Sequence, residues 1–526
     1  MKKIIDLSLL PHEADDKKFI EEIISSNTSL SFSGFRTLRR SIDARRFPVR
    51  VNLQVEIFSE EEFIEEKFQP HLFREADKNK KVIIVGAGPA GLFAALRLLQ
   101  SGIKPIIIER GKPVRERRRD IAILNKQQIV NPESNYCFGE GGAGTYSDGK
   151  LYTRSSKRGN VRKILELFVQ HGASENILIE SHPHIGTNKL PGIIERMRET
   201  ILNNGGEIYF NSTVTDFELQ NNEVQGVKIR KVDTHDELFI AANKLILATG
   251  HSARDIFRLL YSKKILLEPK PFAMGVRVEH PQSLIDKIQY HCRDEQTVQK
   301  LREHLPAASY SLVQQTEGRG VYSFCMCPGG IIAPCATDQN QIVVNGWSPS
   351  KRNNSFANSG MVVNIEPDDL RPYINKGVLA GIYFQQHLEE LCWKSGGEKQ
   401  IAPAQRLVDF VCKKFSSSLP SSSYQPGTTS VSLNDLIPEF ISKRLREGFI
   451  SFGKKMKGYM TNDAVLLAVE SRTSSPIRIP RDTKTFEHVQ VKGLYPIGEG
   501  AGYAGGIMSA AIDGERCGEK ISELFI

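Results

Sequence analysis

Three glycines in the first quarter of the chain have the spacing of a dinucleotide-binding turn. Gly86, Gly88 and Gly91 follow the apolar, β-branched run Lys81–Val85, which predicts a buried parallel strand. The first glycine permits a tight turn, the second lets the backbone approach a pyrophosphate, and the third lets helix and strand pack closely. The N-terminus of the helix that follows would supply amides and partial positive charge to the phosphates.

Glu109 stands where the second strand of this unit ends. The helical pattern Leu92–Gln100 leads into the apolar run Pro105–Ile108, and Glu109 comes next. A carboxylate there accepts hydrogen bonds from the hydroxyls of an adenosine ribose, and it repels a 2′-phosphate. FAD or NAD therefore fits the motif better than NADP. A purely structural glycine turn is the competing interpretation.

Two other glycine runs match the same spacing with less of its context. The first, Gly139–Gly144, follows a polar stretch with no strand. The second, Gly500–Gly505, follows the strand-like Leu494–Ile497 and opens a helix-like segment, but too little chain follows for a second ribose-binding strand. Only the unit at Gly86 has its whole βαβ context.

The choice between FAD and NAD depends on elements further along the chain. An amphipathic helix is predicted at Asn188–Asn204. Three strand-like runs with turn residues between them follow it, at Glu207–Leu219, Glu223–Lys231 and Glu237–Thr249.

The order of these motifs resembles the glutathione-reductase-type FAD superfamily. In that superfamily a βαβ unit is followed by a β-meander ending in A-T-G and by a late strand ending in G-D. Here Thr249 and Gly250 end the meander, and Gly498-Glu499 stands at the position of G-D. The resemblance implies FAD, with Glu499 in place of the usual Asp beside the ribityl chain.

Longer motifs narrow the resemblance to the bacterial family of uncharacterised FAD-dependent dehydrogenases, also called NAD(FAD)-utilising dehydrogenases. The likeness covers nearly the whole chain. The segments that carry it are Phe138–Arg154, His182–Ile193, Phe272–Pro281, Cys325–Gly330, Glu470–Asp482 and Gly498–Ile507.

We therefore expect noncovalent FAD, because no histidine or cysteine sits in an obvious attachment motif. A nicotinamide donor, NADH or NADPH, would bind only transiently in the substrate-side cleft. The glycine loop after Phe138 would lie against the flat flavin, since glycine avoids Cβ collisions. The residues expected to contact FAD are Gly86, Gly88, Pro89, Ala90, Gly91, Glu109, Arg110, Gly141, Gly142, Gly144, Thr145, Val214, Thr249, Gly250, Gly498, Glu499, Gly505, Gly506 and Ile507.

The candidates for catalysis are less specific. His184 and His251 stand in motif-like contexts and are candidate proton donors, with a structural hydrogen-bonding role as the alternative. Arg472, in a polar segment before the last glycine motif, is a candidate for holding a substrate carboxylate or phosphate. An ion-paired loop is the alternative for that segment.

Cys325 and Cys327 are separated by one residue. Disulfide reductases of the resembled superfamily use C-x-x-x-x-C or C-x-x-C beside the flavin. C-x-C on a strand leaves both side chains on one face, with Cα atoms about 6.5 Å or more apart, near the outer limit for a disulfide. We predict packed or pocket-lining thiols, with catalytic thiol chemistry as the alternative. No metal site is expected, because no C-x-x-C pair or nearby histidine completes a ligand set.

Composition is that of an ordinary globular protein. The 526 residues are 40% hydrophobic and 25% charged, with a net charge of +9. No apolar run approaches the roughly 20 residues of a membrane span, and no signal peptide is apparent. Eight scattered cysteines suit reduced thiols, so we expect a cytoplasmic protein. The sequence does not predict an oligomeric state.

The predicted fold class is α/β, a Rossmann-type FAD domain with a β-meander, an inserted α+β substrate domain and a small N-terminal α+β domain. The N-terminal domain is expected to contain helices at Lys17–Ser26 and Thr37–Arg46 and a strand at Val49–Phe58. The expected domains are residues 1–78 (N-terminal), 79–268 (first part of the FAD domain), 269–455 (substrate domain) and 456–526 (last part of the FAD domain).

The predicted function is an FAD-dependent oxidoreductase that transfers a hydride through flavin N5 to or from a small-molecule substrate. One alternative is an FAD-dependent RNA-modifying enzyme that uses the arginine-rich segment Arg36–Arg50. The other is a flavin-binding protein without catalysis. A second arginine cluster, at residues 110–119, is expected near the FAD phosphates or an anionic substrate, unless it is only a solvated helix face.

Overall fold

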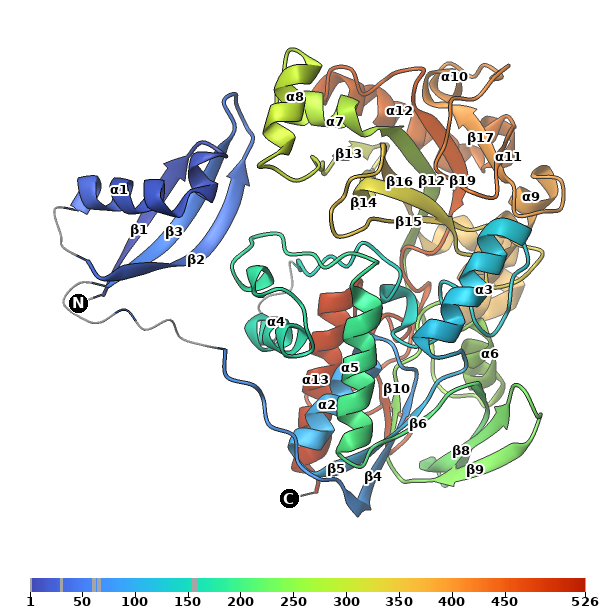
Figure 1. Cartoon of the computed structure of the whole chain (residues 1–526). Helices are drawn as coiled ribbons and strands as arrows, with labels where there is room; N and C mark the ends of the chain where they lie inside the picture. Colours follow the sequence, from blue (N-terminus) through green and yellow to red (C-terminus); the bar gives the residue numbers. More distant parts are fainter. Residues whose placement is uncertain (1, 29–31, 59–62, 64–67, 154–158, 526) are drawn as a thin grey trace.

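The computed structural model describes residues 2–28, 32–58, 63, 68–153 and 159–525. In this part of the chain a parallel sheet and a larger, mostly antiparallel sheet lie one above the other, and a small N-terminal unit lies beside them (Figure 1). The residues outside the described part include Arg154, the end of one motif noted above.

The N-terminal unit is a three-stranded antiparallel sheet with one helix against it. Val51, Leu53 and Val55 alternate along the central strand and are buried against the helix. Its elements, in sheet order, are β1 (Lys2–Leu9), β3 (Arg50–Phe58) and β2 (Gly34–Asp43), with α1 at Lys17–Thr28.

The prediction of a helix at Thr37–Arg46 is wrong, because most of this segment belongs to strand β2. Its backbone pairs with β3 from Gly34 to Asp43, and that pairing overrides the helix preference of the arginines and leucine in it. The expected helix at Lys17–Ser26 and the expected strand at Val49–Phe58 are confirmed as α1 and β3.

The parallel sheet contains the predicted βαβ unit. All neighbours in it run parallel, and residues alternate between its two faces. Val82 and Ile84 face helices, whereas Ile83 and Val85 face the opposite side. The strand order is β21 (Leu494–Pro496), β10 (Leu245–Leu247), β4 (Asp77–Val85), β5 (Ile103–Ile108) and β6 (Glu207–Tyr209).

Four helices pack on the first face of this sheet and share one apolar core with it. The helix of the βαβ unit and the last helix of the chain cross closely at Gly514. Any Cβ there would lie 2.0 Å from the carbonyl oxygen of Ala90, so only glycine permits this crossing. The helices are α2 (Pro89–Gln100), α4 (Val161–Gln170), α5 (Leu190–Asn203) and α13 (Ile507–Glu523).

The opposite face is covered by a three-stranded antiparallel meander and by α6 (Arg254–Ser262). Two of the three strand-like runs of the sequence are therefore split, since the start of the first is β6 and the end of the third is β10, both in the parallel sheet. The meander itself consists of β7 (Ser212–Gln220), β8 (Glu223–Lys231) and β9 (Glu237–Ala241).

The larger sheet shares one apolar core with helix α12 (Glu439–Lys455). Residues of β12 and β16 contribute to this core. β19 pairs with β12 and β17 inside this sheet, so the sheet extends beyond the boundary expected at residue 455. The order is β13 (Val313–Thr316), β14 (Arg319–Pro334), β16 (Phe356–Ile365), β12 (Phe272–Pro281), β19 (Val465–Glu470), β17 (Ala402–Arg406) and β18 (Thr428–Ser430), and β15 (Val344–Trp347) pairs with β14.

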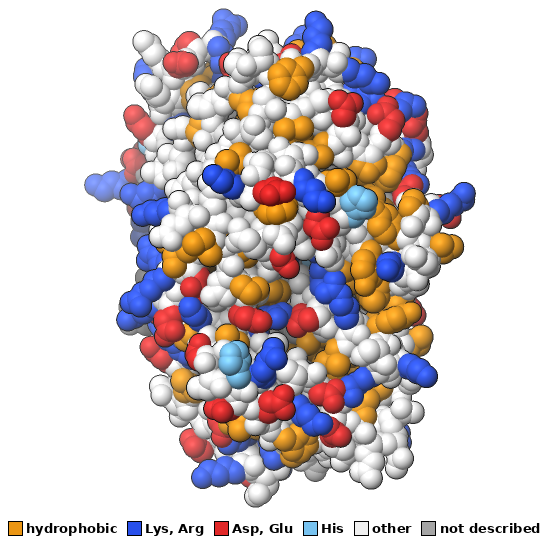
Figure 2. Space-filling model, turned by 90° about the vertical axis from the view of Figure 1, so that its right-hand side faces the viewer, with side chains coloured by type: hydrophobic (Ala, Val, Ile, Leu, Met, Phe, Trp, Pro, Cys, Tyr) orange, Lys and Arg blue, Asp and Glu red, His pale blue; other side chains and the backbone are white. Residues whose placement is uncertain are grey.

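The surface carries charges of both signs. Figure 2 shows Lys and Arg side chains interspersed with Asp and Glu side chains over one face. Across the described residues, no helix combines the length and the apolar character that a membrane crossing requires.

Candidate active site

A pocket lies where the carboxyl ends of three parallel strands meet the larger sheet. Gly86 follows β4, Glu109 follows β5 and Thr249 follows β10, while Cys325 comes from β14 and Asn345 from β15. Ligands of open parallel sheets bind outside the carboxyl ends of the strands. The position of this pocket is therefore the expected one for a dinucleotide.

The glycine turn has the backbone geometry that the sequence predicts. Gly86 has a φ of +106°, which favours glycine. Gly88 is the N-cap of α2 and Pro89 is its first residue, so the free amides of the first turn lie beside the pocket. A Cβ on Gly91 would lie 2.0 Å from the carbonyl oxygen of Gly86, which explains why the third position must be glycine.

Glu109 holds three loops together at the pocket wall. One carboxylate oxygen accepts from the amide of Ala87 at 2.9 Å, and the other accepts from the amides of Gly111 at 3.0 Å and Gly139 at 2.9 Å. Its side chain is almost fully buried. Since a carboxylate has about four acceptor positions, these three bonds leave one for a ligand hydroxyl.

The glycine loop at residues 139–144 is fixed by a fully buried arginine. Arg117 donates to three backbone carbonyls, those of Asn135, Tyr136 and Glu140, at 2.8–2.9 Å. Arg110 pairs with Glu133 and Asp255, at 2.9 Å each, on the pocket wall. Of the second arginine cluster, Arg117 therefore positions the loop, and Arg110 is already neutralised.

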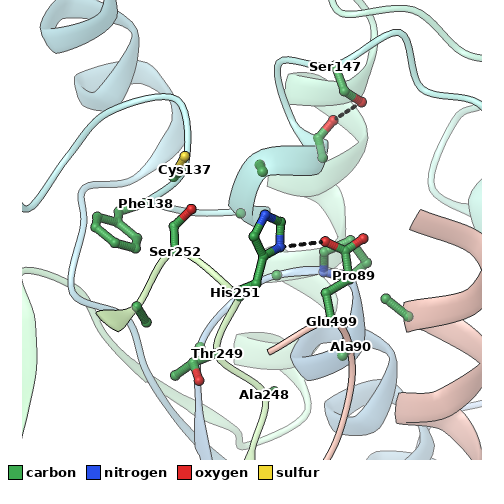
Figure 3. Close-up of a pocket in the computed structure, with 18 of the residues that line it drawn as sticks. Pro89, Ala90, Cys137, Phe138, Ser147, Ala248, Thr249, His251, Ser252 and Glu499 are labelled. Atoms are coloured by element: carbon green, nitrogen blue, oxygen red, sulfur yellow. Dashed lines mark hydrogen bonds and ion pairs between the residues drawn. The ribbon is translucent and has the colours of Figure 1, made fainter. Parts of the chain in front are cut away.

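His251 and Glu499 also line the pocket and lie beside each other (Figure 3). The Nδ1 atom of His251 lies 3.2 Å from Oε2 of Glu499, and its Nε2 lies 2.9 Å from the carbonyl oxygen of Arg472. Both ring nitrogens thus face acceptors. The other carboxylate oxygen of Glu499 accepts from the amide of Gly506. Burial raises the pKa of Glu499, but the contacts with His251 and Gly506 lower it by more. The net result is a pKa below the usual value for glutamate.

Most of the predicted FAD contacts come together in this pocket, and four lie just behind its wall. Thr145 donates to the carbonyl of Glu140, and the Gly498 amide donates to Asp513. The four behind the wall are Gly91, Gly141, Thr145 and Gly498; those that line the pocket are Gly86, Gly88, Pro89, Ala90, Glu109, Arg110, Gly142, Gly144, Val214, Thr249, Gly250, Glu499, Gly505, Gly506 and Ile507.

Three of the four catalytic candidates also line the pocket, namely His251, Cys325 and Cys327. His184 does not. Its Nε2 lies 3.1 Å from the carbonyl oxygen of Ser350, and burial lowers its pKa. A structural role is the better interpretation for His184.

The two cysteines do not share one face of a regular strand, which corrects the expectation from their spacing. Cys325 has a φ of +44°, and the register between β14 and β16 shifts between Phe324 and Cys327. The Cys325 side chain is consequently open to the pocket, whereas Cys327 is buried and its thiol donates to the carbonyl of Cys325 at 3.2 Å. Desolvation by the surrounding protein raises the pKa of Cys325 to about 12.

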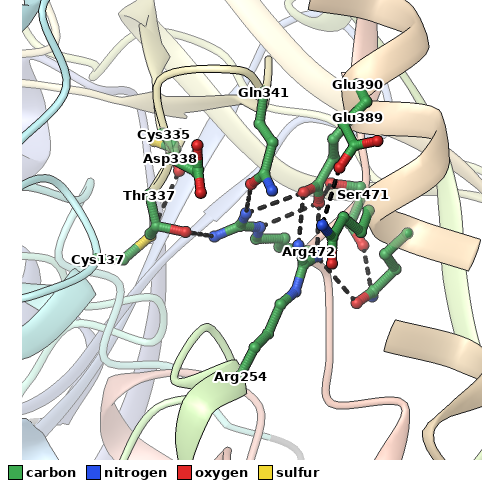
Figure 4. Close-up of polar contacts among 12 residues, drawn as sticks. Cys137, Arg254, Cys335, Thr337, Asp338, Gln341, Glu389, Glu390, Ser471 and Arg472 are labelled. Carbon is green, nitrogen blue, oxygen red and sulfur yellow. Dashed lines mark hydrogen bonds and ion pairs between the residues drawn. The ribbon is translucent and has the colours of Figure 1, made fainter. Parts of the chain in front are cut away.

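Arg472 is held in a buried charge network (Figure 4). Glu389 contacts both Arg472, at 3.0 Å, and Arg254, at 2.8 Å. Burial raises the pKa of Glu389, but the two arginines lower it to about 2. Gln341 and Thr337 accept the remaining Arg472 bonds. The ion-paired alternative for this segment therefore applies to Arg472.

Lys150 and Asn345 are two of the pocket residues that were not found from the sequence. Lys150 follows the glycine loop, where its position directly after Gly149 was the available signal. Asn345 on β15 had none, because its place in the pocket depends on the pairing of β15 with β14. Across the described residues, no group of three or more His, Cys, Asp or Glu side chains is arranged to hold a metal ion.

Three of the six arginines at residues 36–50 pair with carboxylates of the protein. Arg36 contacts Glu56 at 2.6 Å, Arg40 contacts Asp15 at 3.0 Å and Arg45 contacts Asp43 at 2.5 Å. Pairing reduces the positive charge that this segment offers to a nucleic acid, and the RNA-modifying alternative stays a hypothesis without support from the geometry.

Comparison with known proteins agrees with this geometry. Residues 80–256 match the family described as pyridine nucleotide-disulphide oxidoreductase, and residues 271–473 match FAD-dependent protein, C-terminal domain-like. An uncharacterized protein of Clostridium beijerinckii is 38% identical over 533 residues, which cover 97% of each chain. The chain belongs to the FAD-dependent oxidoreductase family. In this member of the family, residues 1–58 also match a domain of unknown function.

The solved structures similar to this FAD-dependent oxidoreductase include two with low sequence identity. A flavoprotein/dehydrogenase from Cytophaga hutchinsonii is 11% identical, with a TM-score of 0.36 over 84% of this chain and 78% of that chain. A geranylgeranyl bacteriochlorophyll reductase-like protein from Thermoplasma acidophilum is 13% identical, with a TM-score of 0.36 over 85% of this chain and 78% of that chain. Likeness at this level says nothing about the substrate.

Proposed function

We propose that the pocket binds FAD noncovalently, in the manner of the glutathione-reductase-type superfamily. The observation that carries this is the convergence of a glycine turn, a helix N-terminus and Glu109 at the carboxyl ends of β4 and β5. The turn at Gly86–Gly91 would hold the pyrophosphate, and the free acceptor position of Glu109 would take a ribose hydroxyl. The glycine turns at residues 142–144 and 505–507 would hold the flavin.

When bound, FAD would supply hydride transfer at N5 to or from a small-molecule substrate. The protein would contribute position and charge. His251 would be oriented by Glu499, whose carboxylate lies 3.2 Å from Nδ1, and the α13 N-terminus at Gly506 would add partial positive charge. A nicotinamide donor would bind transiently from the substrate side, because no second complete βαβ nucleotide unit is apparent in the sequence.

The experiment that tests this is a measurement of cofactor content. The purified protein should be yellow, and acid precipitation should release FAD into the supernatant. Flavin that stays in the pellet would contradict noncovalent binding, and FMN in the supernatant would contradict the dinucleotide site. Anaerobic reduction by NADH or NADPH then separates an oxidoreductase from a flavin-binding protein without catalysis.

Glu109→Ala provides the sharper test of the ribose assignment. Loss of a charge-assisted hydrogen bond is worth roughly 1.5–3 kcal/mol, so the affinity for FAD should fall by about one to two orders of magnitude. The matched control is Glu207→Ala, at the start of β6, whose carboxylate pairs with Lys104 away from the pocket. Equal FAD occupancy of Glu109→Ala and the parent after dialysis would refute the assignment.

A further inference from the structure

Three side chains from separate segments converge at the end of the pocket formed by the larger sheet. They are Lys150 from the loop after the glycine motif, Cys325 from the β14 bulge and Asn345 from β15. Hydrogen bonds made by side chains show that they are neighbours. The ammonium of Lys150 donates to the carbonyl of Met326, the residue next to Cys325.

Arg277 on β12 connects the other two. Its guanidinium donates to the carbonyl of Cys325 at 2.9 Å and to the side-chain oxygen of Asn345 at 3.2 Å. It also pairs with Glu470 at 2.8 Å and donates to Asn358 at 2.8 Å, and it is fully buried. With its bonds thus taken up, Arg277 positions the site and does not reach a ligand.

The amide of Asn345 is oriented by its own acceptor. Its Oδ1 accepts from Arg277 and from the amide of Gly346 at 2.7 Å. The Nδ2 group is therefore the end left for a ligand, and it can only donate.

Lys150 is the cation of this region without a carboxylate partner. Arg277 is balanced by Glu470, and Arg352 is balanced by Asp148 at 2.6 Å. Among the described residues, no carboxylate oxygen lies within 4.0 Å of the Lys150 ammonium. Three cations against two carboxylates leave one positive charge, and two of the three ammonium donors stay unused.

We propose that Lys150 and Asn345 form a subsite for the carboxylate of the substrate, with the Cys325 thiol beside it. The proposal rests on the proposed function, because it makes the substrate of the FAD-dependent reaction a small organic acid. A single ammonium and a single amide match a monoanionic carboxylate. A phosphate dianion would leave most of its oxygens without donors, and neighbouring Asp148 would disfavour the second charge.

Alkylation of Cys325 measures the subsite directly, using iodoacetate as a carboxylate probe and iodoacetamide as its neutral counterpart. The rate ratio of iodoacetate to iodoacetamide is determined at Cys325 by peptide mass spectrometry and is divided by the same ratio at Cys412, an exposed cysteine. We expect this normalised ratio to be about tenfold higher in the parent than in Lys150→Gln. Lys126→Gln, an exposed lysine on the helix Val114–Gln127, should keep the parent value.

The parent measurement alone can overturn the proposal. A normalised ratio near one would refute it even if Lys150→Gln fails to fold. An unchanged ratio in a folded Lys150→Gln would refute the role of Lys150. Because labelling is read without turnover, FAD content measured on the same sample shows separately whether the proposed function has failed.

Competing anions test the carboxylate assignment. Butyrate should slow the reaction of iodoacetate with Cys325 more than inorganic phosphate at the same ionic strength does. Equal or stronger protection by phosphate, or no protection by butyrate, would refute the assignment.

Discussion

The two ends of the pocket are built in different ways. The end at β4 and β5 consists mainly of backbone: glycine turns, the first turn of α2, and amides that a single carboxylate, Glu109, holds together. The end at the larger sheet consists of side chains from β14, β15 and the loop after Gly149, and the buried ion pair of Arg277 with Glu470 lies behind them. The first construction suits the parts that FAD and NAD share, whereas the second would select the proposed substrate. A change of substrate with the same cofactor would thus require substitutions at the second end only.

The largest expected effect lies in the buried charge network around Glu389. Glu389→Gln would leave Arg254 and Arg472 buried without their shared counter-charge. Breaking a buried ion pair costs about 3–5 kcal/mol, so urea denaturation should show a loss of this size. The control is Glu390→Gln, the neighbouring residue, which pairs only with Gln386 at 2.8 Å among the bonds described. A loss as small as that of the control would show that the network contributes little to stability.

The second effect is a dependence of stability on pH that also arises in the larger sheet. His280 on β12 is fully buried, and burial lowers its pKa from 6.5 to about 4. Below pH 6.5 the unfolded chain binds a proton that the folded chain does not bind, so the free energy of unfolding falls as the pH drops from 7 toward 4. Between pH 7 and pH 5 the contribution is about 2 kcal/mol.

Comparison of His280→Gln with the parent at these two pH values isolates that contribution. The glutamine variant should lose less stability on acidification than the parent, whatever its stability at pH 7. His235→Asn, at an exposed turn of the meander, should behave like the parent. Parallel pH profiles for all three proteins would contradict the assignment to His280.

At the cofactor end, Gly91→Ala should act on FAD binding. Its Cβ would lie 2.0 Å from the carbonyl oxygen of Gly86, so the turn must shift at a cost of about 1–3 kcal/mol. We expect at least a roughly tenfold loss of FAD affinity, measured as FAD per chain after dialysis. Gly192→Ala on α5 is the matched control, because its nearest contact is a flexible Arg196 atom at 3.7 Å. Full occupancy of Gly91→Ala would show that the turn tolerates the shift.

The smallest expected effect is on electron capacity. The thiol of Cys327 donates to the carbonyl of Cys325, and the bulge turns the Cys325 side chain toward the pocket. Dithionite should therefore deliver two electrons per FAD both to the parent and to Cys325→Ser/Cys327→Ser. Four electrons in the parent and two in the double variant would demonstrate a working flavin–disulfide pair.

The contrast between the two ends also explains what the sequence could predict. The turn at Gly86 and Glu109 is local, because its residues lie within one βαβ unit, and the structure brings them together as expected. Lys150, Asn345 and Cys325 meet only through the pairing of β14 with β15 and β16. The register shift at Cys325 cannot be recognised in the sequence, because the alternation of side chains along the strand gives no sign of it. Likewise, the pairing that makes Thr37–Asp43 a strand is with β3, beyond any local signal.

The order β21-β10-β4-β5-β6 has a consequence for folding. β4 pairs with β10, and β10 pairs with β21, across connections that contain the whole meander and the whole larger sheet. Contacts between segments so far apart in sequence form slowly, because a long loop must close before they contribute. We expect the cofactor pocket to be among the last parts of the protein to form. Chains that have not yet formed the pocket would then depend on cellular chaperones to a greater degree than the stability of the folded protein suggests.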